Sequence, residues 1–173
     1  KTQKNRIVVD DHMRTSLPWI YACGDINGRL MLAHSAYKMA EVAVENCLGK
    51  KAECDLRFFP SCLYTIPEAA SIGLTEAQAA EHPNGINVGR FNFSANGRAL
   101  GSGAAQGFVK VICDSRYGEI LGVHIVGPSA TEMIMEAAII MSEEITVNEF
   151  VHNVIYAHPT FSEAFYEACA DAI

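Results

Sequence analysis

The sequence predicts an α+β fold built on an antiparallel sheet, and three observations support this. Phe91 and Phe93 alternate with polar residues over 90–94, which is the period of a half-buried strand. Two apolar runs, "FVKVIC" and "EILGVHIVG", are joined by the turn-like "DSRYG" and predict a hairpin. Helix starts recur as the capping-box pattern Ser/Thr-x-x-Glu/Gln, in which each side chain satisfies the other's free backbone donor. The pattern occurs at Ser129/Glu132, Thr146/Glu149, Thr75/Gln78 and Thr160/Glu163.

The first fifty residues are organised differently. Residues 6–9 and 19–22 have the composition of two short strands. Over 33–48 apolar residues recur on one helical face, and Gly49 is placed to end the helix as its C′ residue. The charged segment "KKAECD" then connects to the strand-rich part, so we expect two domains, residues 1–50 and 51–173. The helical face consists of Ala33, Ala36, Tyr37, Ala40, Val44, Cys47 and Leu48.

A helix predicted after Ser129, "ATEMIMEAAIIMSEE", is apolar around most of its circumference. Such a helix needs apolar cover on two sides, and its own sheet supplies one. A second copy of the chain is the simplest candidate for the other side, and burial within a single chain is the alternative. The apolar run 133–141 is interrupted by Glu136, and no run approaches the roughly 18 residues of a membrane-spanning helix.

Composition excludes several classes of function. The 173 residues, half of them apolar, suffice for one full domain and part of a second. A net charge of −7 without a basic cluster argues against nucleic acid and membrane surfaces as partners. The six cysteines show neither C-x-x-C nor C-x4-C spacing, so we expect structural thiols and no metal site. Free thiols suit a reducing compartment, the cytoplasm or, in a eukaryote, the mitochondrial matrix.

The segment around His158 has two interpretations. Pro159 restrains the backbone of His158 just before a predicted helix, and Glu163 follows in the first turn. A carboxylate at this distance can orient an imidazole and favour its protonated form, as an acid/base site requires. Taken alone, Glu163 is better explained as a capping residue, because the same pattern recurs at other helix starts, and the residue chemistry leaves both interpretations of His158 open.

Three stretches, in order, resemble signatures of the pyridine nucleotide-disulfide oxidoreductase family. "YAHPTFSEAF" is similar to its C-terminal signature, most closely to that of the members that oxidise dihydrolipoamide. "IYACGDINGRLMLAH" resembles the segment that closes the FAD site, and "YTIPEAASIG" resembles the strand pair that opens the interface domain. The similarity extends over residues 6–168.

The resemblance implies roles for particular residues. His158 corresponds to the catalytic base and Glu163 to the carboxylate that orients it. In the family this histidine acts across a two-fold interface on the redox disulfide of the other subunit, and electrons pass through FAD to a nicotinamide, here taken as NAD. Asp25 corresponds to the acidic residue that hydrogen-bonds a ribityl hydroxyl of FAD. The helix start whose backbone donors approach the flavin pyrimidine edge corresponds to Met31, Leu32, Ala33 and His34.

For the whole chain, the resemblance implies an interface domain with an antiparallel sheet of about five strands and flanking helices. It is preceded by a remnant of an FAD-binding domain. The glycine-rich fingerprints and the cysteine pair of the family do not occur, since "GSGAAQG" has no following helical pattern. We therefore expect the C-terminal part of a larger flavoprotein, inactive and without tightly bound FAD on its own. The complete protein is expected to be a homodimer that oxidises dihydrolipoamide and serves a 2-oxo acid dehydrogenase complex or the glycine cleavage lipoyl protein.

Two alternatives remain. Tyr156 stands where the members that oxidise dihydrolipoamide commonly carry a histidine, so a reductase of another disulfide, such as glutathione, is the alternative within the family. The alternative from another class is a dimerisation module without a catalytic task. In that module His158 and Glu163 only cap a helix.

Overall fold

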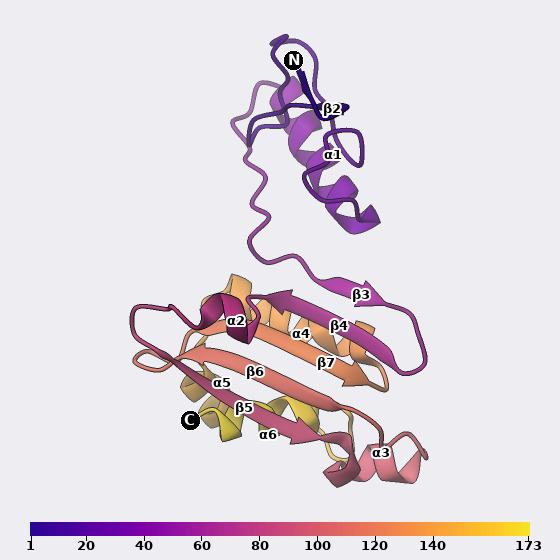
Figure 1. The fold of residues 1–173 in the computed structure, drawn as a ribbon, viewed down its shortest axis with the longest axis vertical. Helices are drawn as coiled ribbons and strands as arrows, with labels where there is room; N and C mark the ends of the chain where they lie inside the picture. Colours follow the sequence, from indigo (N-terminus) through magenta and orange to yellow (C-terminus); the bar gives the residue numbers. More distant parts are fainter. The chain divides into compact units, whose positions relative to one another are not determined.

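A computed structural model describes residues 1–173, which form two compact units, Lys1–Arg57 and Phe58–Ile173 (Figure 1). Each unit has its own apolar core. Met13, Met39 and Val42 lie at the centre of the first core, and a larger core covers one face of the sheet of the second. Each unit is therefore described by itself.

The second unit contains a five-stranded antiparallel sheet of order β3-β4-β7-β6-β5, which confirms the predicted α+β class. The two apolar runs form the hairpin β6–β7, and "YTIPEAASIG" lies in the pair β3–β4, as predicted. The strand β5 forms one edge of the sheet. It ends at Asn92, before Phe93 of the predicted alternation, because a 3₁₀ turn, η1 (Phe93–Ala95), follows. The strands are β3 (Ser61–Leu63), β4 (Glu68–Gly73), β5 (Ile86–Asn92), β6 (Phe108–Asp114) and β7 (Ile120–Gly127).

Two helices cover one face of this sheet. The helix α4 packs on β4 and β7, and α6 packs on β5 and β6 (Figure 1). Ile72, Val111 and Val123 point from the strands into the core that α4 and α6 complete. None of the helices has both the length and the apolar character needed to cross a membrane. The helices of this unit are α2 (Glu76–Ala79), α3 (Gly97–Gly101), α4 (Ala130–Ser142), α5 (Val147–Asn153) and α6 (Glu163–Asp171).

The opposite face of the sheet carries a row of polar side chains. Strand register aligns Ser71, His124, Lys110 and Arg90 in one row across four strands. Glu76, at the start of α2, forms ion pairs with Arg90 and Lys110. Alternation along each strand therefore places the main apolar core on one face and this polar row on the other, as the period of two requires.

Two of the four predicted capping boxes are confirmed. Thr75 with Gln78 and Thr146 with Glu149 make both reciprocal hydrogen bonds at the starts of α2 and α5. These pairs are local, so the sequence pattern is sufficient to specify them.

The predicted capping box at Ser129 is wrong. Ser129 has a left-handed backbone conformation (φ 55°) and its side chain caps nothing. The carboxylate of Glu68 on β4 takes its place, accepting hydrogen bonds from the Thr131 backbone nitrogen (2.9 Å) and hydroxyl (2.7 Å). The fourth pair is half formed, because the Thr160 nitrogen donates to Glu163 (2.8 Å) while the Thr160 hydroxyl donates to the carbonyl of Ala157.

The helix α4 is buried on one face only. Met133, Ile134 and Ala137 face the sheet, whereas Ile139 is 59% exposed and Met135 is also exposed. Burial within a single chain therefore does not cover this helix on two sides, and an apolar face remains open to solvent.

The first unit consists of a short hairpin and one long helix. The hairpin is β1 (Thr2–Gln3) with β2 (Arg6–Ile7), and the helix is α1 (Ala33–Cys47). Gly49 ends the helix as predicted, with φ +84°. Its nitrogen donates to Asn46, and the nitrogen of Lys50 donates to Glu45, which is the Schellman arrangement.

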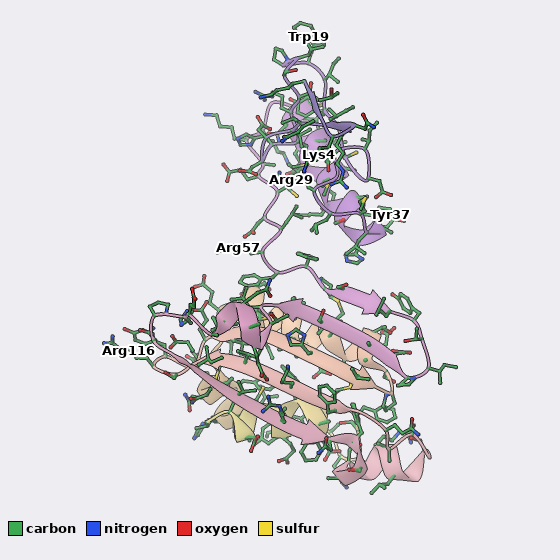
Figure 2. The ribbon with its side chains drawn as sticks, in the orientation of Figure 1. Lys4, Trp19, Arg29, Tyr37, Arg57 and Arg116 are labelled. Carbon is green, nitrogen blue, oxygen red and sulfur yellow. The ribbon has the colours of Figure 1, made fainter.

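The strand predicted at 19–22 does not form. Only Tyr21 makes a β-bridge, with Arg14. The nitrogen of Thr15 donates to the carbonyl of Ile20, which closes a turn and leaves Trp19 exposed at its tip (Figure 2). With the chain turning here, no neighbouring strand is available to extend the bridge.

The buried face of α1 is not the apolar face seen in the sequence. Tyr37 is 73% exposed and projects from the helix (Figure 2), and Val44 and Leu48 are also exposed. The helix instead buries a mixed face around Met39, on which Asn46 makes hydrogen bonds to His12 and Ala52. The buried residues are Ser35, Met39, Val42, Ala43 and Asn46.

The contact of α6 with β5 depends on Gly89. A Cβ atom at this position would lie 2.0 Å from the carbonyl oxygen of Ala168 and 2.6 Å from the nitrogen of Ala172. We expect Gly89→Ala to lower the free energy of unfolding by about 1–3 kcal/mol, as overpacking of a rigid contact does, in urea titrations of the chain. Gly97→Ala is the control, because no atom lies within 4 Å of its added Cβ. Equal stability of the two variants would contradict the close approach of α6.

Candidate functional site

His158 lies in the irregular segment 154–162, between α5 and α6. Its side chain is 76% exposed, and a cis peptide bond joins it to Pro159. An imidazole in this position is accessible to a reactant from solvent or from another protein surface. The helix α6, which begins five residues later, is fixed on the sheet and supplies a rigid support for the segment.

The carboxylate of Glu163 holds both the ring and the backbone of this segment. Its Oε1 lies 2.7 Å from Nδ1 of His158, and its Oε2 accepts a hydrogen bond of 2.8 Å from the nitrogen of Thr160. An ionised carboxylate only accepts, so Nδ1 of the neutral ring carries the proton and Nε2 remains a free acceptor. The arrangement therefore provides an oriented base.

The charge of Glu163 is stabilised by this geometry. The hydrogen bond with His158, and next the one from the Thr160 nitrogen, hold the pKa of Glu163 below its ordinary value. Glu163 is also the first residue of α6, where the helix dipole favours a negative charge. The carboxylate therefore stays ionised in the neutral range and can stabilise an imidazolium.

Asp25 lies in a tight turn of the first unit. Gly24, with φ +77°, begins the turn, and the nitrogen of Gly28 donates to the Asp25 carbonyl at 3.1 Å. A positive φ of this kind suits glycine. The side chain of Asp25 is exposed, so the turn presents a carboxylate to solvent.

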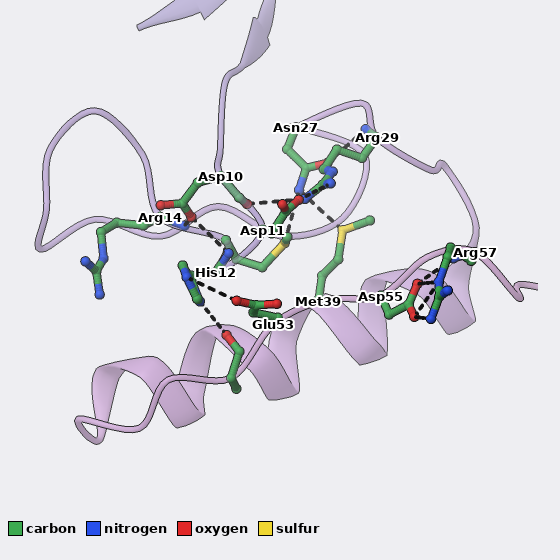
Figure 3. A network of polar contacts seen from close by, with 12 residues as sticks. Asp10, Asp11, His12, Arg14, Asn27, Arg29, Met39, Glu53, Asp55 and Arg57 are labelled. Carbon is green, nitrogen blue, oxygen red and sulfur yellow. Dashed lines mark hydrogen bonds and ion pairs between the residues drawn. The ribbon is translucent and has the colours of Figure 1, made fainter. Parts of the chain in front are cut away.

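The turn is held by Asn27, a residue that sequence reasoning missed. Its buried side chain donates to the carbonyl of Ala22 (3.0 Å) and to the sulfur of Met39 (3.3 Å), and accepts from the nitrogen of Arg29 (3.0 Å). Arg29 in turn pairs with Asp11 at 2.6 Å (Figure 3). An asparagine within a glycine-flanked turn was the available signal, because such side chains commonly bond to nearby backbone.

Residues 31–34 form the start of α1. Leu32 is the N-cap residue with an extended backbone, and no side chain caps the helix. The hydroxyl of Ser35 donates back to the carbonyl of Leu32 (2.7 Å), and Met31, Ala33 and His34 are exposed. An N-terminus without a side-chain cap offers backbone donors and a positive dipole end to an electron-rich group.

The predicted residues thus form two groups. His158 and Glu163 are joined by a hydrogen bond in the second unit, whereas Asp25 and the helix start at 31–34 belong to the first. All six cysteines are free thiols, and burial raises the pKa of Cys54, Cys113 and Cys169. No group of three or more His, Cys, Asp or Glu side chains is arranged to hold a metal ion.

The lowered pKa of Glu163 predicts a pH dependence of stability. Folding favours its ionised form, so its contribution is complete above the ordinary value of 4.5 and is lost as the pH falls through the lower folded-state pKa. Urea unfolding from about pH 7 to about pH 3 should show the stability difference between the wild type and Glu163→Gln shrinking below that value. Glu167→Gln, which removes an exposed carboxylate from the next turn of α6, controls for net charge. A difference that does not vary with pH would contradict this assignment.

Comparison with known proteins identifies relatives of both units. Residues 59–169 match the dimerisation domain of the pyridine nucleotide-disulphide oxidoreductases, and residues 1–40 match the pyridine nucleotide-disulphide oxidoreductase family. The chain is 43% identical to the dihydrolipoyl dehydrogenase of Bacillus subtilis over 167 residues, and 44% identical to that of Rhizobium etli over 174 residues. These alignments cover 96% and 99% of this chain but only 36% of each relative, so the chain spans about a third of their length.

Solved structures agree with this relationship. The crystal structure of LpdA from Mycobacterium tuberculosis superposes with a TM-score of 0.90 at 30% identity, covering 98% of this chain and 37% of that one. RclA from Escherichia coli, an HOCl-induced flavoprotein disulfide reductase, also superposes with a TM-score of 0.90. At 24% identity, covering 98% of this chain and 39% of that one, it shares the fold. Because the dimerisation-domain match covers more than half of the chain, the chain belongs to the pyridine nucleotide-disulphide oxidoreductase family.

Proposed function

We propose that this chain is part of a flavoprotein that oxidises dihydrolipoamide to lipoamide with NAD, through FAD and a redox disulfide located outside the chain. The carrying observation is the His158–Glu163 pair, with Nδ1 and Oε1 2.7 Å apart in an exposed segment. The named relatives, which are dihydrolipoyl dehydrogenases, support the choice of substrate.

In this proposal His158 is the catalytic base. Its Nε2 accepts the proton of a substrate thiol, and the resulting thiolate attacks the redox disulfide to form a mixed disulfide. The second thiol of the substrate then attacks the first substrate sulfur in the mixed disulfide and displaces the protein thiolate, which releases lipoamide and leaves both protein sulfurs reduced. Glu163 keeps Nδ1 protonated and stabilises the imidazolium that forms on proton transfer.

The residues of the first unit fit an FAD site. The exposed carboxylate of Asp25 is a hydrogen-bond acceptor suited to a ribityl hydroxyl, and the start of α1 offers backbone donors over residues 31–34. We propose Asp25, Met31, Leu32, Ala33 and His34 as the part of this chain that contacts the cofactor. When bound, FAD accepts the electron pair from the reduced disulfide and passes it to NAD.

A homodimer is the proposed assembly, with residues 51–173 as the interface domain and residues 1–50 as part of the FAD-binding domain. The apolar face of α4 with Met135 and Ile139, and the nearby exposed Ile155, supports an isologous contact through this unit. The match to a dimerisation domain supports the same assembly. His158 of one subunit then serves the disulfide of the other.

The proposed partners and location follow from the substrate. Lipoyl groups are carried by 2-oxo acid dehydrogenase complexes and by the glycine cleavage lipoyl protein, which we propose as the partners. Six free thiols support a reducing compartment, the cytoplasm or the mitochondrial matrix.

The test is NADH production from dihydrolipoamide by the complete protein that contains this chain. His158→Ala should lower the rate by about 10²–10⁴-fold, the usual contribution of a positioned base, and should retain flavin. His152→Ala is the control, because this exposed histidine on α5 bonds to the carbonyl of Asn148 in its own helix and has no part in the proposed reaction. Glu163→Gln should cost less than His158→Ala, because glutamine still accepts a hydrogen bond.

The outcomes separate the alternatives. Wild-type rates in His158→Ala would refute the assignment of the base. Activity restricted to glutathione with NADP would retain the chemistry and change the substrate. A complete protein without flavin and without either activity would favour the dimerisation module.

The FAD assignment predicts a separate effect. Asp25→Ala should weaken flavin binding by the complete protein about 10- to 100-fold, the loss expected for one hydrogen bond to a charged acceptor. The flavin affinity is measured by equilibrium dialysis, with the fluorescence of the free flavin as the readout. Glu41→Ala removes an exposed carboxylate from α1 and should leave flavin affinity unchanged. Equal affinity in the wild type and Asp25→Ala would contradict the assignment.

A further inference from the structure

Glu136 is a carboxylate on the otherwise apolar middle of α4, and the proposed reaction does not use it. It is half-buried and accepts hydrogen bonds from two hydroxyl groups. Tyr156 donates to its Oε2 at 3.4 Å, and Ser162 donates to its Oε1. Both donors belong to the irregular segment that carries His158.

Placing a carboxylate here is costly. Removing it from water is unfavourable unless hydrogen bonds compensate, and this burial raises the pKa of Glu136 while Ser162 and Tyr156 oppose the rise. An apolar side chain would pack on the same helix without this cost. A carboxylate at this position therefore indicates a role that depends on its hydrogen bonds, which an apolar side chain cannot make.

The two donors stand on opposite sides of the histidine. Tyr156 precedes His158 by two residues, and Ser162 follows it by four. One carboxylate on a helix packed against the sheet thus holds both ends of the segment. The ring of Tyr156 is itself fixed, because it packs edge-on against Phe150 (centroids 5.8 Å apart) and in a tilted arrangement against Tyr166 (5.2 Å).

Packing alone does not fix the segment on this side. A cleft of about 350 Å³ lies between α4 and the segment, with Glu136, Tyr156 and Ser162 in its wall. Apolar contact across a cleft is incomplete, and the directional hydrogen bonds to Glu136 join the segment to α4 across it. Glu163 contacts the ring within the segment, and Glu136 joins both ends of the segment to α4, whereas Asn96 holds its middle through the carbonyl of Thr160.

We propose that Glu136 is the positioning residue for His158. It acts through the hydroxyls of Tyr156 and Ser162 to hold the segment 154–162 at the distance from α4 that places His158 for the reaction. This inference rests on the proposed function of His158. It also gives a role to Tyr156, the residue that departs from the family pattern, because its hydroxyl reaches the carboxylate.

The first test is Glu136→Gln in the complete protein. The amide nitrogen donates, so the variant cannot accept from both hydroxyls. We expect kcat for dihydrolipoamide oxidation to fall about 10- to 100-fold, since a misplacement of about 1 Å has effects of this size, with a smaller change in KM. Flavin reduction by NADH without dithiol does not need the base and should stay at the wild-type rate. Glu132→Gln, an exposed carboxylate one turn earlier on α4, is the matched control and should match the wild type in every assay.

A second readout separates positioning from general destabilisation. Amide hydrogen exchange over 154–162 should be faster in Glu136→Gln, while exchange in β6 and β7 stays unchanged. Faster exchange throughout the sheet would overturn the proposal. Tyr156→Phe and Ser162→Ala, which each remove one hydroxyl, should lower kcat about 3- to 10-fold and add little to Glu136→Gln, because all three act through one carboxylate. Additive losses would likewise overturn the proposal.

His158→Ala, assayed in parallel, separates this inference from the proposed function. If His158→Ala keeps the wild-type rate, the proposed function fails and the role of Glu136 fails with it. If His158→Ala is slow but Glu136→Gln and Tyr156→Phe turn over at the wild-type rate, only the positioning role fails.

Discussion

The second unit depends on the burial of one apolar face of its sheet beneath α4 and α6. This packing fixes the two helices that bear the carboxylates of the site, Glu136 and Glu163. The segment between α5 and α6 has no regular structure, and it is held by hydrogen bonds to these carboxylates, by the hydrogen bond from Asn96 to the Thr160 carbonyl and by packing of Tyr156 and Phe161 on the core. Close approach at Gly89, where α6 meets β5, therefore bears on the position of His158 as well as on stability.

Glu163 combines two roles, capping of the helix start and orientation of the His158 ring, which the sequence offered as alternatives. One carboxylate oxygen accepts from the Thr160 backbone, as a capping residue does, and the other faces the His158 ring. The helix start and the oriented imidazole are thus one arrangement, in which satisfying a backbone donor also fixes the carboxylate for the ring. Evidence for capping at this position is therefore not evidence against catalysis.

In the first unit, buried polar side chains rather than apolar packing alone define the local geometry. Asn27 ties the turn that bears Asp25 to Ala22 and to Met39 on α1, and Asn46 ties α1 to the carbonyls of His12 and Ala52. Each amide is inexpensive to bury because its donors and acceptors are paired. The turn with Asp25 is thus anchored on α1, the same helix whose start at residues 31–34 belongs to the proposed FAD contact.

The sequence alone determined the elements whose interactions are local: the hairpin β6–β7, the capping boxes at Thr75 and Thr146, and the end of α1 at Gly49. Tertiary structure decided what depends on distant residues. Glu68 on β4 caps α4 in place of Ser129, and α1 buries its mixed face while its apolar face stays exposed. Glu136 appeared in the sequence only as an interruption of an apolar run, because its partners, Tyr156 and Ser162, lie 20 and 26 residues away. Local periodicity carries information over one or two turns, whereas these contacts exist only once the chain has folded.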